Sequence, residues 1–238
     1  MKFDLRARAT AEFVGTAFLL AAIIGSGIMG ERLAGGNVAI VLLANALATG
    51  AALVALILTF GPISCAHFNP AVTLAEALVH RIGWRDAVAY IAAQCCGGIV
   101  GAIVAHLMFG LRRYSLSSHV RSGWPLLLSE FVASFGLVTV IFCSSRLQSN
   151  VTPYAVAGYI VAAYWFTAST SFANPAVTIA RSLSDTFAGI RPSDVPGFIA
   201  SQLAGTVAAT LLFRRLVPES PAQARNEISC NSPVDNLI

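Results

Sequence analysis

The pentapeptide Asn-Pro-Ala-Val-Thr occurs twice in this chain, at residues 69–73 and at residues 174–178. An asparagine followed by a proline is typical of a helix start, because the asparagine caps the first turn and the proline lacks only a donor that would be unpaired there. A side-chain amide also has N–H groups that can donate to a polar molecule. The residues of the two motifs are Asn69, Pro70 and Ala71 in the first copy, and Asn174, Pro175 and Ala176 in the second.

The chain around these motifs has the composition of a membrane protein. Of its 238 residues, 56% are hydrophobic and 11% are charged, against about 25% charged residues in an average soluble domain. Residues 33–75 and 151–180 contain no Asp, Glu, Lys or Arg. A membrane-spanning helix needs only about 20 apolar residues. The composition therefore excludes a water-soluble domain and predicts a multi-pass protein with the lipid bilayer as its surroundings.

The apolar windows predict an all-α membrane protein. Gly61-Pro62 is expected to end the second span, because proline lacks a backbone donor and disfavours helix at the residue before it. After the second and fifth spans about a dozen charge-free residues remain, which is about half a bilayer of helix. The fold class is therefore six transmembrane helices plus two re-entrant half-helices. The predicted spans are near residues 9–30, 38–60, 87–108, 125–145, 152–171 and 195–216.

The two halves of the chain match each other. Glu12 in AEFVGTAF corresponds to Glu130 in SEFVASFG, and Gln94 corresponds to Gln202. Three spans in each half is an odd number, so the halves cross the membrane in opposite senses and form an inverted repeat. The expected organisation is a first repeat at 1–108, a linker at 109–123, a second repeat at 124–217 and a disordered cytoplasmic tail at 218–238.

An inverted repeat brings the starts of the two half-helices together near the middle of the membrane. Each helix N-terminus carries about half a positive charge, so a cation meets a barrier there while a neutral hydroxylated molecule meets hydrogen-bond donors. Glu12 and Glu130 lie inside spans, where a carboxyl group is costly. We expect them to brace the re-entrant loops through hydrogen bonds, and a proton relay is the other interpretation.

The distribution of basic residues predicts which side each loop occupies. With a cytoplasmic N-terminus, nine of the 15 Lys and Arg residues lie inside and six outside, which agrees with the positive-inside rule. The basic residues flank the spans and form no patch, so no nucleic-acid partner is expected. Short loops favour a bacterial inner membrane. The residues form no catalytic constellation, and the histidines lie at no metal-ligand spacing, so we expect no enzyme, no metal and no cofactor.

The paired motifs, the two glutamates and the segment GPISCAHFNPAVT at residues 61–73 resemble the aquaporin and aquaglyceroporin (major intrinsic protein) family. The resemblance covers residues 9–217. It implies a right-handed helical bundle that assembles as a homotetramer with one pore in each subunit. It also implies passive, bidirectional conduction of water or small neutral solutes.

The chain departs from that family at one position. Most members have an arginine three residues after the second motif asparagine, where this chain has Val177. The family's spacing implies that the constriction comprises Thr49, Ala162, Ser171 and Val177. This set holds no aromatic residue and no charge, so we expect a widened filter that passes solutes larger than water. Bacterial members with an altered second motif region resemble channels for trivalent arsenic. The expected solutes are glycerol-like polyols, arsenous acid, related metalloid hydroxides and water.

Three other features have two interpretations or a minor role. Arg181 lies one helical turn beyond Val177 on a similar face. It is either a displaced version of the missing charge in the outer vestibule or a basic residue at the membrane interface. His67 is expected to offer its carbonyl group or ring to the inner pore wall. The Cys95-Cys96 pair either binds arsenic or packs within a helix, as free cysteines commonly do.

Two alternatives to a tolerant channel follow from the sequence. An ion-coupled secondary transporter also uses inverted repeats with broken helices. It is disfavoured because we expect no Asp, Glu or Lys in the pore apart from the bracing glutamates. A narrow water channel or a closed structural member of the family is disfavoured by the small residues expected at the constriction.

Overall fold

The computed structural model describes residues 3–216, and these residues form helices and no strand. The predicted tail at 218–238 lies outside the described residues. In chain order the helices are α1 (Leu5–Leu33), α2 (Val38–Ser64), α3 (Pro70–Leu78), α4 (Trp84–Met108), α5 (Trp124–Leu147), α6 (Thr152–Phe166), α7 (Pro175–Arg181) and α8 (Val195–Leu216), with the 3-10 turns η1 (Ser149–Val151) and η2 (Pro192–Asp194).

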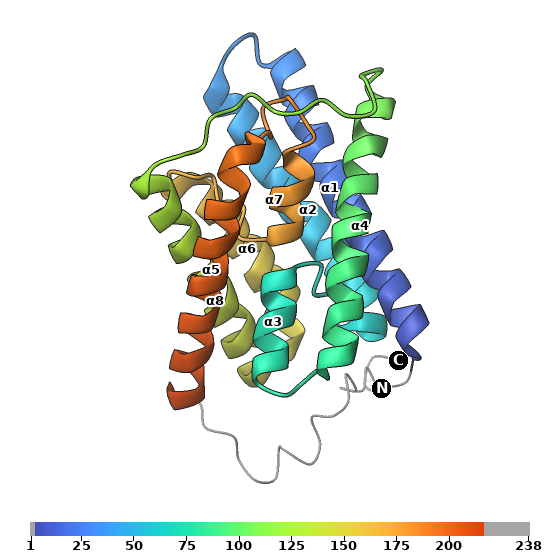
Figure 1. The fold of residues 1–238 in the computed structure, drawn as a ribbon, viewed down its shortest axis with the longest axis vertical. Coiled ribbons are helices and arrows are strands. Elements are labelled where there is room, and N and C mark those ends of the chain that lie inside the picture. Colours follow the sequence, from blue (N-terminus) through green and yellow to red (C-terminus); the bar gives the residue numbers. More distant parts are fainter. Residues whose placement is uncertain (1–2, 217–238) are drawn as a thin grey trace.

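The long helices stand side by side around two short ones (Figure 1). Helix α1 begins and α8 ends at the same end of the bundle, which we call the inner end. The segment 109–123, which has no regular secondary structure, crosses the opposite end, which we call the outer end. The short helices α3 and α7 lie one above the other in the middle and contact each other.

Five helices of the described chain are long and apolar enough to cross a membrane, namely α1, α2, α4, α5 and α8 with η2. Helix α6 is shorter than the predicted span because it ends at Phe166 rather than continuing to residue 171. Thr167 has extended backbone, and its hydroxyl group donates to the carbonyl group of Ala163 at 2.7 Å. The chain therefore leaves the helix well before the second motif.

The prediction that Gly61-Pro62 ends the second span is wrong. Helix α2 continues through Pro62 to Ser64 and ends at Cys65, whose backbone is left-handed with a φ of 68°. Pro62 stands in the last turn, where the loss of one N–H donor removes a single hydrogen bond. The N–H group of Cys65 still donates to the carbonyl group of Gly61 at 2.9 Å.

Glycines let two pairs of helices approach to backbone contact. On α4, a Cβ atom built on Gly101 would lie 2.2 Å from the carbonyl oxygen of Ala17 on α1. On α8, a Cβ atom on Gly205 would lie 2.3 Å from the carbonyl oxygen of Phe131 on α5. Small residues are the usual means of close helix packing in membranes. These contacts fix the long helices that carry the residues of the central site.

Candidate functional site

The two motif asparagines cap the two short helices, as predicted. The Oδ1 atom of Asn69 accepts the N–H group of Ala71 at 2.9 Å at the start of α3. The Oδ1 atom of Asn174 accepts the N–H groups of Ala176 at 3.0 Å and of Val177 at 3.3 Å at the start of α7. Both N-termini therefore have a side-chain cap and a proline at the first helical position.

The amide nitrogens of the same asparagines join the two halves of the chain. The Nδ2 atom of Asn69 donates to the carbonyl oxygen of Ala173 at 2.8 Å, and the Nδ2 atom of Asn174 donates to that of Phe68 at 2.9 Å. Each carbonyl group belongs to the residue just before the opposite asparagine. Because a side-chain amide carries two hydrogens, each Nδ2 atom retains one N–H group beyond this contact.

The segments that lead into the two motifs have the same unusual backbone. A left-handed conformation costs a non-glycine residue about 1–2 kcal/mol, and such residues persist only where their surroundings fix them. The equivalence of the positions in the two segments shows that each lead is built in the same way. The left-handed residues are Cys65, Ala66 and Phe68 before α3, and Thr170, Ser171 and Ala173 before α7.

Glu12 holds the first of these segments from α1. Its carboxylate accepts the N–H groups of His67 at 2.9 Å and Phe68 at 2.7 Å. It also accepts the hydroxyl group of Ser64 at 2.6 Å and the amide of Gln94 at 2.8 Å. A carboxylate accepts charge-assisted hydrogen bonds that are stronger than neutral ones, so these bonds offset the backbone strain.

Glu130 has the same position in the second half. Its carboxylate accepts the N–H groups of Phe172 and Ala173, both at 2.9 Å, and the amide of Gln202 at 2.6 Å. Gln202 also donates to the hydroxyl group of Thr178 on α7 at 2.9 Å. Both carboxylates are fully buried, and each binds the backbone of its motif segment directly.

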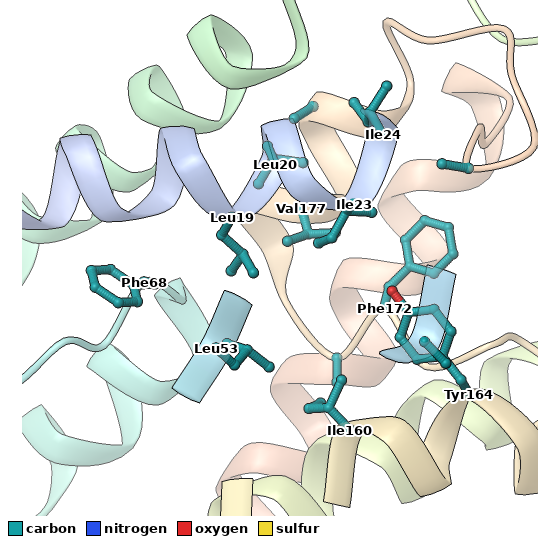
Figure 2. Close-up of a cluster of buried hydrophobic side chains, with 14 of the residues drawn as sticks. Leu19, Leu20, Ile23, Ile24, Leu53, Phe68, Ile160, Tyr164, Phe172 and Val177 are labelled. Carbon is teal, nitrogen blue, oxygen red and sulfur yellow. The ribbon is translucent and has the colours of Figure 1, made fainter. Parts of the chain in front are cut away.

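A cavity of about 370 Å³ runs past both motifs and is lined by residues of both halves. One part of the cavity wall is apolar. Figure 2 shows four of the side chains that line this part: Leu19, Leu53, Ile160 and Val177. The motif asparagines supply polar atoms to the same cavity. Seven residues singled out in the sequence line it: Thr49, His67, Asn69, Ser171, Asn174, Val177 and Arg181.

The assignment of Ala162 to the constriction is wrong. Ala162 lies on an exposed face of α6, whereas Ile160 and Tyr164 line the cavity. Residues four apart share a helix face, while a residue two positions away lies on the far side. The hydroxyl groups of Thr49 and Tyr164 lie 3.2 Å apart. The cavity therefore contains an aromatic residue beside Thr49, contrary to expectation.

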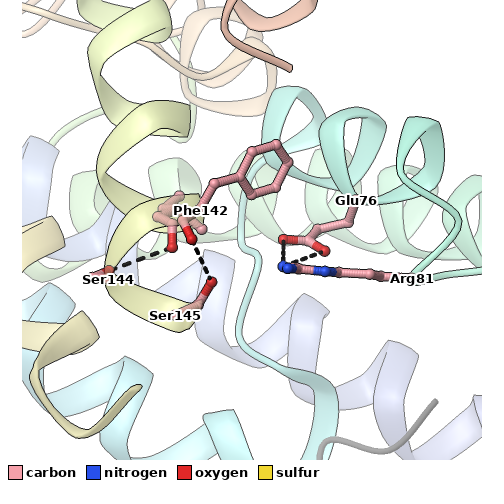
Figure 3. Close-up of polar contacts among 6 residues, drawn as sticks. Glu76, Arg81, Phe142, Ser144 and Ser145 are labelled. Carbon is pink, nitrogen blue, oxygen red and sulfur yellow. Dashed lines mark hydrogen bonds and ion pairs between the residues drawn. The ribbon is translucent and has the colours of Figure 1, made fainter. Parts of the chain in front are cut away.

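The expectation of no acidic residue in the pore beyond the bracing glutamates is also wrong. Glu76 and Arg81 line the inner part of the cavity and form an ion pair with an N–O distance of 3.5 Å. Figure 3 shows this pair beside Phe142 of α5, whose ring lies 5.5 Å from the guanidinium carbon of Arg81. Charge is therefore present at the inner end of the cavity, in a paired form.

His67 and the two adjacent cysteines have different surroundings. The Nδ1 atom of His67 lies 3.1 Å from the hydroxyl group of Thr73, and its ring packs edge-on against Tyr90. Cys95 is half-buried and Cys96 is exposed, both are free thiols, and neither lines the cavity. From their position on α4, the two cysteines do not contact a molecule inside the cavity.

Comparison with known proteins adds three findings. The profile of the family described as Major intrinsic protein matches residues 2–170. The chain is 52% identical to aquaglyceroporin AqpS of Rhizobium meliloti (strain 1021), over 91% of this chain and 92% of the relative. It is 32% identical to aquaporin NIP1-4 of Oryza sativa subsp. japonica, over 90% of this chain and 78% of the relative.

A solved structure has the same fold. The X-ray structure of the aquaglyceroporin from Plasmodium falciparum superposes with a TM-score of 0.70 and covers 90% of this chain and 98% of its own. The sequence identity is 16%, so this likeness concerns the arrangement of helices and not the residues that line the cavity.

Proposed function

This chain belongs to the major intrinsic protein family, and we propose that it is a passive membrane channel for small neutral solutes. The solutes are glycerol-like polyols, arsenous acid, related metalloid hydroxides and water. The relatives from Rhizobium meliloti and Oryza sativa are named an aquaglyceroporin and an aquaporin. These are channels, so the protein is a channel and not an enzyme.

The observation that supports this function best is the pair of asparagines at the meeting point of α3 and α7. Asn69 and Asn174 line the cavity and each has an N–H group beyond its contact with the other half. A polyol or arsenous acid can accept hydrogen bonds from these amides, while its less polar side lies against Leu53 and Ile160. Such a cavity compensates a hydroxylated solute for lost water without binding it tightly.

Val177 supports the proposal that the filter admits solutes larger than water. Its side chain lines the cavity where most family members have an arginine, and an isopropyl group occupies much less space than a guanidinium group on its three-carbon stem. Thr49 and Tyr164 add two hydroxyl groups to the same cavity. The cavity therefore has one apolar side and one hydrogen-bonding side, as an arsenous acid or glycerol filter requires.

An ion-coupled transporter is the second candidate, and Glu76 is the observation in its favour. A carboxylate in the transport path can bind a coupling ion or proton. Against it, Glu76 forms an ion pair with Arg81, and it lies at the inner end rather than at the meeting point of the two halves, where a coupling site is expected. The passive channel is therefore the better proposal.

The protein is an integral, multi-pass membrane protein. We place it in a bacterial plasma membrane, because its relative with 52% identity comes from a bacterium. The proposed assembly is a homotetramer with one pore in each subunit, as the family resemblance implies. In support of one pore per subunit, residues from both halves of the chain line the same cavity.

The variant Val177→Arg tests the filter. In proteoliposomes, the wild type should pass water, glycerol and arsenous acid above the lipid background. The variant should keep its water permeability. Its permeabilities to glycerol and arsenous acid should each fall about tenfold or more, because the guanidinium group narrows the path. A tenfold fall corresponds to an activation barrier higher by about 1.4 kcal/mol. Stopped-flow light scattering measures water and glycerol, and elemental analysis measures arsenic uptake.

Val177→Ile is the matched control, since it changes shape and not charge. It should conduct all three solutes within about twofold of the wild type, a barrier change of under about half a kcal/mol. If the wild type passes glycerol but not arsenous acid, the metalloid part of the proposal is wrong. If Val177→Arg conducts glycerol as well as Val177→Ile does, then Val177 does not set the width of the pore.

A further inference from the structure

Two arginines pack against one phenylalanine at the outer part of the cavity. The guanidinium carbon of Arg181 lies 3.4 Å from the centroid of the Phe172 ring, and that of Arg121 lies 5.1 Å from it. Arg181 ends α7, Arg121 belongs to the segment 109–123, and Phe172 belongs to the left-handed lead before α7. Contacts of cations with an aromatic face are favourable within about 6 Å.

Arg121 is fixed by its own hydrogen bonds. Its Nε atom donates to the carbonyl group of Gly189 at 2.7 Å, and its Nη atoms donate to those of Ser169 and Phe187, both at 3.3 Å. Burial lowers the pKa of Arg121, but an arginine begins from so high a value that it stays charged at neutral pH. Arg121 is therefore a rigid cation that ties the outer segments together and supports the Phe172 ring.

Arg181 is buried but its hydrogen-bonding groups are only partly used. It is 1% exposed, lines the cavity, and its Nε atom donates to the carbonyl group of Ala188. Its Nη1 atom is buried without a hydrogen-bond partner in residues 3–216. Within the same residues no carboxylate lies at ion-pair distance from it. An unpaired buried donor of this kind costs about 1–3 kcal/mol, so Arg181 stands in the cavity wall as a cation that its surroundings compensate only in part.

We propose that Arg181 is the specificity-determining residue at the outer end of the pore, and that Arg121 positions it through Phe172. The guanidinium charge, which no carboxylate of residues 3–216 pairs with, repels cations that enter the cavity. This inference rests on the proposed function, because it assigns the charge selectivity of the same channel to a particular residue.

The position of Arg181 separates two tasks. Val177 and Arg181 are four residues apart on α7, which is about one helical turn or 5.4–6 Å along the axis. The uncharged side chain at Val177 leaves the path wide, while the charge one turn further out maintains an electrostatic barrier to cations. Size selection and charge exclusion thus occur at two levels, so a wide filter need not conduct protons or small cations.

The test uses full-length variants in proteoliposomes and two readouts. Glycerol flux reports on conduction, and entry of methylammonium and protons reports on the charge barrier. The variants are Arg181→Gln, Arg181→Lys and Arg121→Gln. Arg32→Gln is the matched control, because Arg32 also stacks on a ring, 5.0 Å from the Phe109 centroid, and donates to a carbonyl group at 2.8 Å, but does not line the cavity.

We expect Arg181→Gln to admit methylammonium and protons at least about tenfold faster than the wild type, a change of about 1.4 kcal/mol in barrier. Arg181→Lys should retain the barrier because it retains the charge. Arg121→Gln should leak to a smaller extent, and Arg32→Gln should not leak. This order would not arise from a general loss of packing, since Arg181→Lys also disturbs the fit on Phe172.

The remaining outcomes distinguish a failure of the proposed function from a failure of the inference about Arg181. If the wild type itself does not conduct glycerol, the proposed function fails. If the wild type conducts and Arg181→Gln excludes cations equally well, this inference fails and the proposed function stands. Leakage by Arg181→Lys equal to that of Arg181→Gln would also overturn it, because charge would not be the cause. If Arg181→Gln does not fold, the other two variants provide the test. Entry of methylammonium and protons through Arg181→Lys would overturn the inference. The absence of such entry through Arg121→Gln would also overturn it.

Discussion

At the scale of single residues, two buried carboxylates hold the strained backbone before each motif. Glu130 accepts two backbone N–H groups and one amide, and Glu12 accepts a matching set. Without these acceptors, the N–H groups would be buried and unpaired beside three left-handed residues in each segment. The glutamates therefore determine whether the asparagines stay at the meeting point of α3 and α7.

Replacing Glu130 with Gln should destabilise the protein by about 1–3 kcal/mol, because an amide NH₂ group would face backbone donors that now bind a carboxylate oxygen. Thermal unfolding in detergent measures the effect. Glu31→Gln is the control, since the exposed Glu31 also accepts one backbone N–H group, that of Phe187, at 3.1 Å. Equal melting temperatures for the two variants would show that Glu130 does not brace its segment.

The sequence predicts some of these residues and misses others for a physical reason. Asn69 and Asn174 are predictable as caps because the helix begins at the next residue, so the local motif determines the geometry. The family's spacing implies Ala162 at twelve residues before Asn174, but the intervening stretch is irregular, with left-handed residues at Thr170 and Ser171. Such a stretch does not preserve helical register, and a two-residue error put the wrong face of α6 in the cavity.

The residues of α6 that line the cavity follow the helical repeat. Val156, Ile160 and Tyr164 recur at intervals of four and all line the cavity. No periodic pattern in the sequence points to Arg121, because it lies in a segment without regular structure. Its hydrogen-bond partners lie in loops that are distant from it in sequence. Contacts between loops depend on the packed fold and have no local pattern.

At the scale of elements, the close contact of α1 with α4 fixes the distance between Glu12 and Gln94, which bind each other at 2.8 Å. Gly101 permits this contact, because any side chain there would meet the carbonyl oxygen of Ala17. The corresponding contact at Gly205 does the same for α5 and α8. The packing of the long helices and the hydrogen bonds of the motif segments are therefore coupled.

Gly101→Ala should destabilise the protein by about 1–3 kcal/mol, since the new Cβ atom forces α1 and α4 apart. The matched control is Gly158→Ala on α6, where nothing lies within 4 Å of the added atom. That control should be neutral or slightly stabilising, because alanine favours helix over glycine by about 1 kcal/mol. Thermal unfolding of the two variants in one detergent compares them. A Gly101→Ala protein as stable as the control would contradict this packing.

Apolar windows predict that helices exist but not where they end. The window near 38–60 missed the last turn of α2, and the window near 152–171 passed the end of α6 by five residues. Both ends lie inside charge-free stretches, so no charged residue marks them. The actual ends depend on a left-handed residue at Cys65 and on extended backbone at Thr167. Neither residue is a glycine, so the amino-acid composition does not predict its backbone conformation.

At the scale of the whole molecule, both halves contribute to one cavity that is polar at the motif asparagines and apolar opposite them. The Nδ2 atoms of Asn69 and Asn174 join the halves at that point, because each donates to the carbonyl oxygen just before the opposite asparagine. Glu12 and Glu130 each hold the motif segment of their own half. A neutral solute that passes the motifs therefore meets residues of both halves in one cavity. The protein as a whole should therefore conduct passively.

The measurement that tests this claim most directly is glycerol flux through the wild-type protein in proteoliposomes, in both directions, with and without ionophores. We predict fluxes that are equal in the two directions for equal gradients, proportional to concentration, and unchanged when ionophores remove ion and proton gradients. Glycerol should reach the external concentration and not exceed it. Accumulation above the external concentration, or a flux abolished by ionophores, would contradict passive conduction and would indicate a transporter coupled through Glu76.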